Sequence, residues 1–188
     1  MKQISVVLAG SLLAVAFIIG TAFGYYLTPE YRAVASDKTV MDLGAPDKLL
    51  DLRYLRAMTI HHQGAILLAE QLQKYAGHQE LKTLAPIILA DEPKNIAVLQ
   101  GLRLNKFNDR RPLASPTRVN LGTADANFDL RFLNALIAHH EAGVLMAREA
   151  RAKSTSPEII NDAEGVEKFL TGSLIDLRKM RLDWYNIK

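Results

Sequence analysis

From residue 47 onward, the apolar positions follow the period of an amphipathic α-helix. Leucine, isoleucine and alanine recur at steps of three and four, which keeps one broad face of each segment apolar. No stretch alternates apolar and polar residues with the period of a strand, so we expect an all-α domain. The pattern predicts four helices, over 47–76, 80–104, 125–152 and 157–185.

Prolines and polar runs set the boundaries of these segments. Ser156 followed by Pro157 is typical of a helix cap and a first helical position. Pro86 and Pro93 fall inside the second segment, where we expect a late start, a kink or a break. Residues 105–124 lack the helical pattern and predict a long connection between the second and third helices.

The second pair of helices repeats the first at a constant offset of 78 residues. The offset continues into the second helix of each half, where Glu80 meets Glu158 and Leu99 meets Leu177. Two copies of one hairpin bury their apolar faces against each other about a pseudo-twofold axis, so the repeat predicts a four-helix bundle. In the first copy, the residues that meet an identical partner include Asp51, Leu52, Arg53, Leu55, Ala57, His61, His62, Leu67 and Ala69.

An uncharged run covers residues 4–27. At about 1.5 Å per residue it is long enough to cross a hydrocarbon layer of about 30 Å, whereas the apolar part of a secretory signal is about 7–15 residues long. We therefore expect a membrane anchor over 1–27, with a cleaved signal as the alternative, then a linker over 28–46 and the bundle domain over 47–188. Lys2 favours an N-terminus inside the cell, with the bundle on the periplasmic or extracytoplasmic side.

The expected membrane helix carries small residues one turn apart, at Gly20 and Gly24. Such a face packs closely against another membrane helix, so the predicted partners are the membrane and another membrane protein. The net charge of +3 is too small to indicate nucleic-acid binding, and no basic stripe interleaved with aromatic residues is present. We expect no nucleic-acid partner.

Two pairs of adjacent histidines are the candidate chemistry. They occupy matching positions in the first and third helices, so we expect them to meet across the core of the bundle. The chain has no cysteine, and imidazole combined with thioether suits Cu(I) or Ag(I), while imidazole also accepts Cu(II) and Zn(II). The sequence predicts a metal site with ligands from His61, His62, His139, His140, Met58 and Met146.

Three acidic residues are candidate acceptors for the ring N–H groups: Asp51, Asp129 and Glu141. In the competing interpretation, the histidines are structural, bonded to carboxylates or carbonyls, and bind no metal. His78 lies in the first hairpin turn, where we expect it to be solvated or to act as a cation at a helix C-terminus. The chain contains no Glu-x-x-His motif and no nucleophile elbow, and we expect no enzymatic activity.

The stretch RAMTIHHQGAILLAEQL resembles the signature of the domain-of-unknown-function family 305, which reads roughly Met-x-x-His-His-x-x-Ala-x-x-Met-Ala. Leu68 replaces the second methionine of that pattern in the first copy. In the second copy, Leu136 replaces the first methionine and Gly143 the first alanine. The resemblance covers about 47–185. It implies a ferritin-like four-helix bundle in a family that is often exported and includes copper- and silver-binding periplasmic proteins. Loss of one methionine from each copy argues against a high-affinity Cu(I) site.

Two functions follow from these observations. The first is a membrane-anchored, extracytoplasmic helical-bundle protein that binds copper or another soft metal through its paired histidines. The second is a non-enzymatic accessory or structural subunit of a larger membrane protein complex, with no bound metal.

Overall fold

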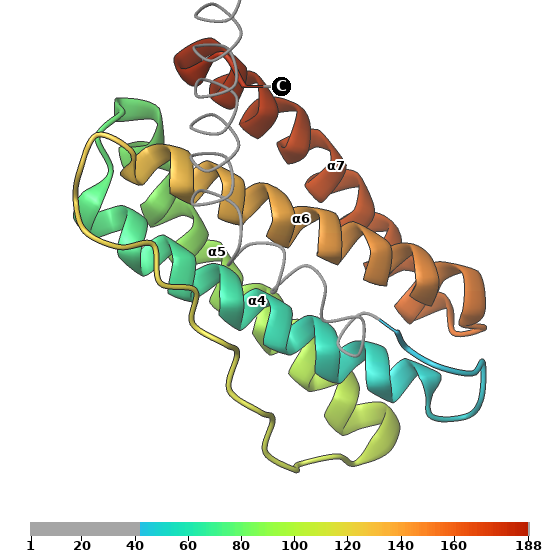
Figure 1. Cartoon of the computed structure of the whole chain (residues 1–188). Helices are drawn as coiled ribbons and strands as arrows, with labels where there is room; N and C mark the ends of the chain where they lie inside the picture. The colour runs from blue at the N-terminus through green and yellow to red at the C-terminus, as the bar shows by residue number, and fades with distance from the viewer. Residues whose placement is uncertain (1–41, 188) are drawn as a thin grey trace, which may run out of the picture.

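The computed structural model describes residues 42–187. Four helices make up this part of the chain and no strand occurs in it, which confirms the all-α prediction (Figure 1). None of the described helices is long and apolar enough to cross a membrane, and the anchor predicted over 1–27 lies outside the described residues. The helices are α4 (Leu50–Tyr75), α5 (Gln79–Phe107), α6 (Phe128–Lys153) and α7 (Pro157–Tyr185).

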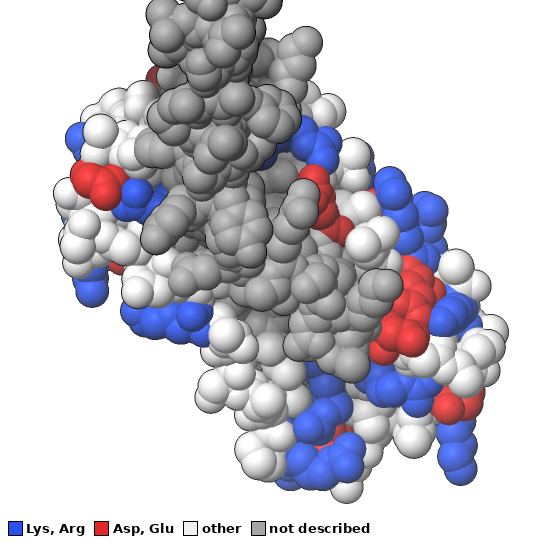
Figure 2. Space-filling view, in the orientation of Figure 1, with Lys and Arg blue, Asp and Glu red and all other residues white. Residues whose placement is uncertain are grey.

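The helices form two antiparallel hairpins that meet mainly through one helix of each. α4 packs against α5, α6 packs against α7, and α4 and α6 lie side by side (Figure 1). Tyr54, Phe128 and Phe132 are fully buried and are among the largest side chains of the core. The faces of α4 and α6 that carry the histidine pairs therefore lie at the junction of the two hairpins. Lysine, arginine, aspartate and glutamate side chains are interspersed over the surface visible in Figure 2.

The internal repeat is visible in the contacts that start each hairpin. Arg53 Nε donates to the carbonyl oxygen of Leu43 at 2.5 Å, and Arg131 Nε donates to that of Leu121 at 2.6 Å. Gly44 and Gly122, which follow those carbonyls, adopt φ values of 73° and 77°. All three pairs are 78 residues apart. The repeat therefore extends upstream of the first helix to residue 43.

α5 is continuous from Gln79 to Phe107 although it contains Pro86 and Pro93. The predicted late start or break is wrong. Both prolines are exposed on the outer side of the helix. A carbonyl that loses its helical partner on that side is free to bond water, so proline there does not leave a buried group unsatisfied.

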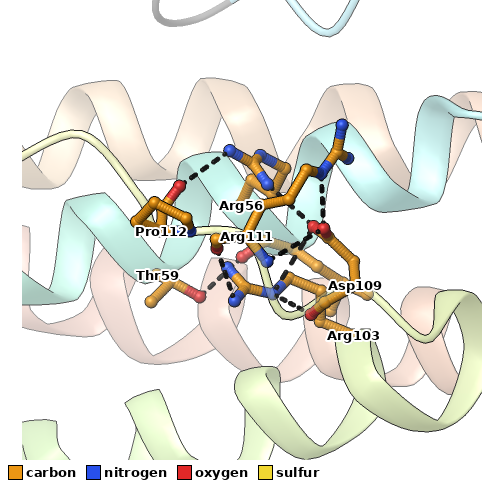
Figure 3. Close-up of polar contacts among 7 residues, drawn as sticks. Arg56, Thr59, Arg103, Asp109, Arg111 and Pro112 are labelled. Carbon is orange, nitrogen blue, oxygen red and sulfur yellow. Dashed lines mark hydrogen bonds and ion pairs between the residues drawn. The ribbon is translucent and has the colours of Figure 1, made fainter.

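The connection between the hairpins runs over 108–127 and follows α4 (Figure 1). A buried carboxylate holds its start in place, because Asp109 accepts from Arg111 at 2.6 Å and from Arg56 at 2.7 Å (Figure 3). Arg103 Nε donates to the Asp109 carbonyl at 3.1 Å. The hydrogen bonds from Arg111 and Arg56 lower the pKa of the Asp109 carboxyl well below its usual range, so it stays ionised.

Candidate metal centre

The four imidazoles lie in one row across the junction between α4 and α6. The rings of His61 and His139 are stacked, with centroids 3.8 Å apart and planes inclined by 1°. The ring of His62 lies 6.0 Å from that of His61, and the ring of His140 lies 6.2 Å from that of His139. The structure thus brings together the two histidine pairs singled out by the sequence.

A glycine on each of these helices makes the close approach of the rings feasible. A Cβ atom placed on Gly143 would lie 2.6 Å from His61 Nε2, and one placed on Gly64 would lie 3.2 Å from His139 Cε1. In the sequence, Gly143 is a departure from the family pattern. In the structure, the His61 ring occupies the space that a side chain at position 143 would fill.

The histidine row forms one wall of a cavity of about 470 Å³. The opposite walls come from α5 and α7, so the cavity lies between the outer helices of the two hairpins. The lining is mixed, because apolar side chains alternate with acids and amides. Besides the four histidines, the lining includes Asp91, Glu92, Asn95, Asp162, Phe169 and Leu170.

The outer two histidines each have one ring nitrogen occupied by a neighbour. Nδ1 of His62 lies 2.5 Å from Glu92 Oε2, and both side chains are largely buried. Nε2 of His140 lies 3.1 Å from the Ser173 hydroxyl oxygen. In contrast, Nδ1 of His140 and Nε2 of His139 are buried with no hydrogen-bond partner among the described residues. Such orphaned nitrogens are unusual in a folded protein and are suited to a ligand that accepts their lone pairs.

Burial keeps three of the imidazoles neutral. It lowers the pKa of His61 well below the usual value, and the nearby His139 ring lowers it further. Burial also lowers the pKa of His139 to about 3 and that of His140 to about 4. Neutral imidazole is the form that coordinates a metal, so these rings need not lose protons before binding at neutral pH.

The donor set fits a soft cation, although the rings are not arranged around one point. Within residues 42–187, no three His, Asp or Glu side chains are grouped closely enough to hold a metal ion. The stacking of His61 on His139 is the reason. The lone pair of an imidazole lies in the ring plane, so two parallel stacked rings cannot both direct a lone pair at the same ion. His61 or His139 must turn about its side-chain bonds before both rings contact one ion.

The two predicted methionine ligands lie away from the cavity lining. Met58 and Met146 are 0% and 1% exposed and belong to a hydrophobic cluster that also contains Leu43, Tyr54 and Ile159. Neither methionine lines the cavity. The structure therefore gathers the four imidazoles at the cavity and places both thioethers in the core.

The predicted carboxylate acceptors bond to other groups. Asp51 accepts from the Ser154 hydroxyl at 2.6 Å, and Glu141 accepts from Arg178 at 2.7 Å. Asp129 accepts from backbone N–H groups of the first hairpin turn. None of the three has a hydrogen bond to the paired histidines, so this part of the prediction is wrong. Asp51 and Asp129 lie in the first turns of their helices and bond to the turn of the opposite hairpin instead.

His78 is partly exposed, as expected, with 39% of its side chain accessible. It also makes contacts that the sequence did not predict, because its Nδ1 lies 2.6 Å from Asp129 Oδ2 and its ring stacks on Trp184 at 3.9 Å between centroids. These contacts tie the first hairpin turn to the end of α7.

Sequence reasoning missed Glu92 and Ser173. They lie on α5 and α7, 30 and 33 residues after the histidines that they contact. At the repeat offset, Glu92 corresponds to Leu170 and Ser173 to Asn95, so the repeat is not conserved at either position. The repeat itself therefore gave no signal for these two contacts.

Several solved structures are similar to this chain. The structure of CopM in the Cu(I)-bound form has a TM-score of 0.65 and 28% sequence identity, covering 72% of this chain and 97% of that chain. CopM in the Ag-bound form, obtained by co-crystallization, has a TM-score of 0.64 and 29% identity, with the same coverage. CopM in the apo form gives 0.64 and 29%, covering 72% of this chain and 98% of that chain. No curated protein sequence matches this chain.

The sequence also matches the profile of one protein family along most of its length. The matches cover residues 29–103, 51–123 and 113–181, and the family is described as a domain of unknown function, DUF305. The matches include both histidine pairs and both hairpins. The resemblance seen in the paired-histidine signature is thus confirmed, and the chain belongs to the DUF305 family.

Proposed function

We propose that this protein binds copper as its cargo, in the cavity between α5 and α7, through His61, His62, His139 and His140. The observation that carries the proposal is the pair of buried ring nitrogens without partners, on His139 and His140. Both belong to rings whose pKa is lowered by burial, so both rings are neutral at neutral pH and each has one nitrogen with a lone pair. The similar CopM chain has been solved in Cu(I)-bound, Cu(II)-bound and Ag-bound forms, which supports copper as the ligand.

The small number of donors that can converge favours a monovalent ion. Imidazole alone accepts copper in either oxidation state as well as Zn(II), but Cu(I) and Ag(I) accept few ligands. A few converging donors suffice for them, whereas Zn(II) prefers four ligands in a tetrahedron. We propose that Met58 and Met146 shape the core behind the histidines and are not first ligands, because neither lines the cavity.

The cellular placement is also part of the proposal. The uncharged run over 4–27 anchors the protein, and the helical domain lies on the extracytoplasmic side. A protein held on that side of the membrane encounters copper before the copper enters the cytoplasm. Its role is binding rather than catalysis.

The test uses a competition titration of the full-length protein in mild detergent, with Cu(I) and a coloured Cu(I) chelator. The double variant His139→Gln/His140→Gln removes both orphaned nitrogens. His78→Gln is the matched control, because His78 is the one histidine of the five outside the two pairs and lies at the first hairpin turn, away from the cavity. Circular dichroism checks that each variant is folded.

We expect the wild type and His78→Gln to bind Cu(I) equally, and the double variant to lose most of its affinity. Binding by the double variant equal to that of the wild type would refute the cavity site. A folded wild type that does not compete for Cu(I) would refute copper binding and leave the accessory-subunit function.

A further inference from the structure

The two hairpins treat their outer histidines differently. His62 has Nδ1 occupied, at 2.5 Å from Glu92 Oε2. His140, its counterpart in the repeat, has the other nitrogen occupied, with Nε2 at 3.1 Å from the Ser173 oxygen. The contact partners come from α5 in one hairpin and α7 in the other, and both helices line the cavity. The duplicated histidines therefore use different ring nitrogens for these contacts.

The two copies of the repeat differ in sequence at the residues that contact the outer histidines. Leu170 stands where the first copy has Glu92, and Asn95 stands where the second copy has Ser173. Leu170 also lines the cavity, so the same wall position is a carboxylate in one half and a hydrocarbon in the other. The repeat has diverged at the positions that touch the histidines, while the histidines themselves are unchanged.

The chemistry of the partners determines which nitrogen is free. A carboxylate only accepts hydrogen bonds, so Nδ1 of His62 carries the proton and Nε2 keeps its lone pair. That Nε2 makes no hydrogen bond within residues 42–187. In His140, the serine hydroxyl occupies Nε2 and leaves Nδ1 buried without a partner. A hydroxyl can donate or accept, and Nδ1 keeps its lone pair when the hydroxyl accepts from an Nε2–H. Each ring thus has one unoccupied nitrogen, and the two nitrogens are of different kinds.

We propose that Glu92 and Ser173 are positioning residues that make the duplicated histidines coordinate through different atoms, Nε2 of His62 and Nδ1 of His140. This inference rests on the proposed binding of a soft metal in the cavity. It adds that the site is asymmetric although the fold around it is a repeat.

Glu92 has the larger effect of the two positioning residues. In the described part of the chain it is the only acid within hydrogen-bonding distance of the paired histidines. Its negative charge also acts on His140 in the other hairpin, where it opposes the effect of burial on the pKa. An anionic partner makes an imidazole a stronger donor and fixes its tautomer, and loss of such a partner weakens metal binding by about 10–100-fold.

Nuclear magnetic resonance of the full-length protein, with ¹⁵N-labelled histidine and in detergent, reads the nitrogens directly. Ag(I) is the probe, because it is diamagnetic and soft. We expect Ag(I) to shift Nε2 of His62 and Nδ1 of His140 and to leave their other nitrogens nearly unchanged. A shift at Nδ1 of His62 or at Nε2 of His140 would overturn the inference while leaving metal binding intact. No shift at any imidazole nitrogen would overturn the proposed function as well.

Variants of Glu92 separate its charge from its hydrogen bond. Glu92→Leu installs the residue of the other copy, and we expect it to lower Ag(I) affinity by about 10–100-fold and to release His62 into the Nε2–H tautomer. Glu92→Gln keeps an acceptor oxygen, so it retains the Nδ1–H tautomer with a smaller loss. Glu164→Gln, the same change at an exposed site on α7, leaves both readouts unchanged. Wild-type affinity and tautomer in Glu92→Leu would refute the role of Glu92.

Discussion

The contact between His61 and α6 predicts an unusual effect of adding one methyl group. Gly143 lies within α6, where replacing glycine by alanine normally stabilises a helix by about 1 kcal/mol. At this position, however, the new Cβ would lie 2.6 Å from His61 Nε2 and 2.5 Å from Leu170 Cδ1. Both separations are shorter than real Cβ contacts, so something must move.

The two neighbours differ in how easily they yield. Leu170 Cδ1 is the end of a flexible side chain and can turn away, whereas the ring of His61 is packed in its stack with His139. Overpacking of a core costs about 1–3 kcal/mol. After the gain in helix propensity is subtracted, we expect Gly143→Ala to lower the free energy of unfolding by about 1 kcal/mol, and by up to about 2 kcal/mol if the ring cannot move.

Gly172→Ala provides the matched control. Gly172 is an exposed residue of α7, and a Cβ there would have no atom within 4 Å. We expect it to raise the free energy of unfolding by about 0.5–1 kcal/mol, the ordinary gain of alanine over glycine in a helix. The two variants carry the same chemical change with opposite expected signs.

Urea unfolding of the two variants and the wild type, followed by the fluorescence of Trp184, measures the difference. Trp184 is the only tryptophan, and it reports the joint between α7 and the first hairpin turn. If Gly143→Ala were as stabilising as Gly172→Ala, the His61 ring would not lie against α6, and the stacked arrangement of the histidine row would be wrong.

Three further predictions follow from the site and the fold. Burial lowers the pKa of His61, His139 and His140, so below about pH 6.5 the unfolded chain binds more protons than the folded one. The free energy of unfolding of the metal-free protein is therefore highest above that pH and falls as the pH drops towards about 4. Urea unfolding at about pH 5.5 should give about 1.4 kcal/mol less per buried ring than at about pH 7.5, about 4 kcal/mol in total, and equal values would contradict the burial. Met58→Leu/Met146→Leu, which installs in each copy the residue of the other, should change the free energy of unfolding by less than about 1.5 kcal/mol and leave Cu(I) affinity intact; a large loss of affinity in the chelator competition would make the thioethers ligands. Asp109→Asn removes the charge that Arg56 and Arg111 share, and limited proteolysis should then cut the 108–127 connection faster than in the wild type.

The helices were predictable because their signal is local. Apolar spacing and the 78-residue repeat identify four helices and pair them into hairpins without reference to distant contacts. The uninterrupted course of α5 was not predictable in the same way. Whether a proline breaks a helix depends on which side its ring and the freed carbonyl face, and Pro86 and Pro93 face solvent only because of how α5 packs on α4.

The site was predictable where it is duplicated and not where it is unique. The repeat identifies the four histidines, because a pair of adjacent histidines within an apolar helix is unusual and occurs at the same position of both copies: His61, His62, His139 and His140. Glu92 breaks the repeat, and its contact with His62 depends on how the hairpin closes. The expected acceptors failed for the same reason. Asp51 and Asp129 share a helix with a histidine pair, but the carboxylate that reaches a ring comes from the neighbouring helix.

The orphaned nitrogens of His139 and His140 destabilise the metal-free protein. Each buried polar group without a partner costs about 1–3 kcal/mol, and a leucine at that position would remove the cost. A bound ion that takes both lone pairs removes that cost and stabilises only the folded state. Because the stacked rings of His61 and His139 must also turn to share an ion, binding and repacking are coupled at the main helix–helix interface between the hairpins. Metal should therefore strengthen the contact between α4 and α6 more than the contacts within either hairpin. Hydrogen exchange with and without Ag(I) tests this, since added protection confined to α5 and α7 would mean that the ion sits at the cavity mouth and not on the histidine row.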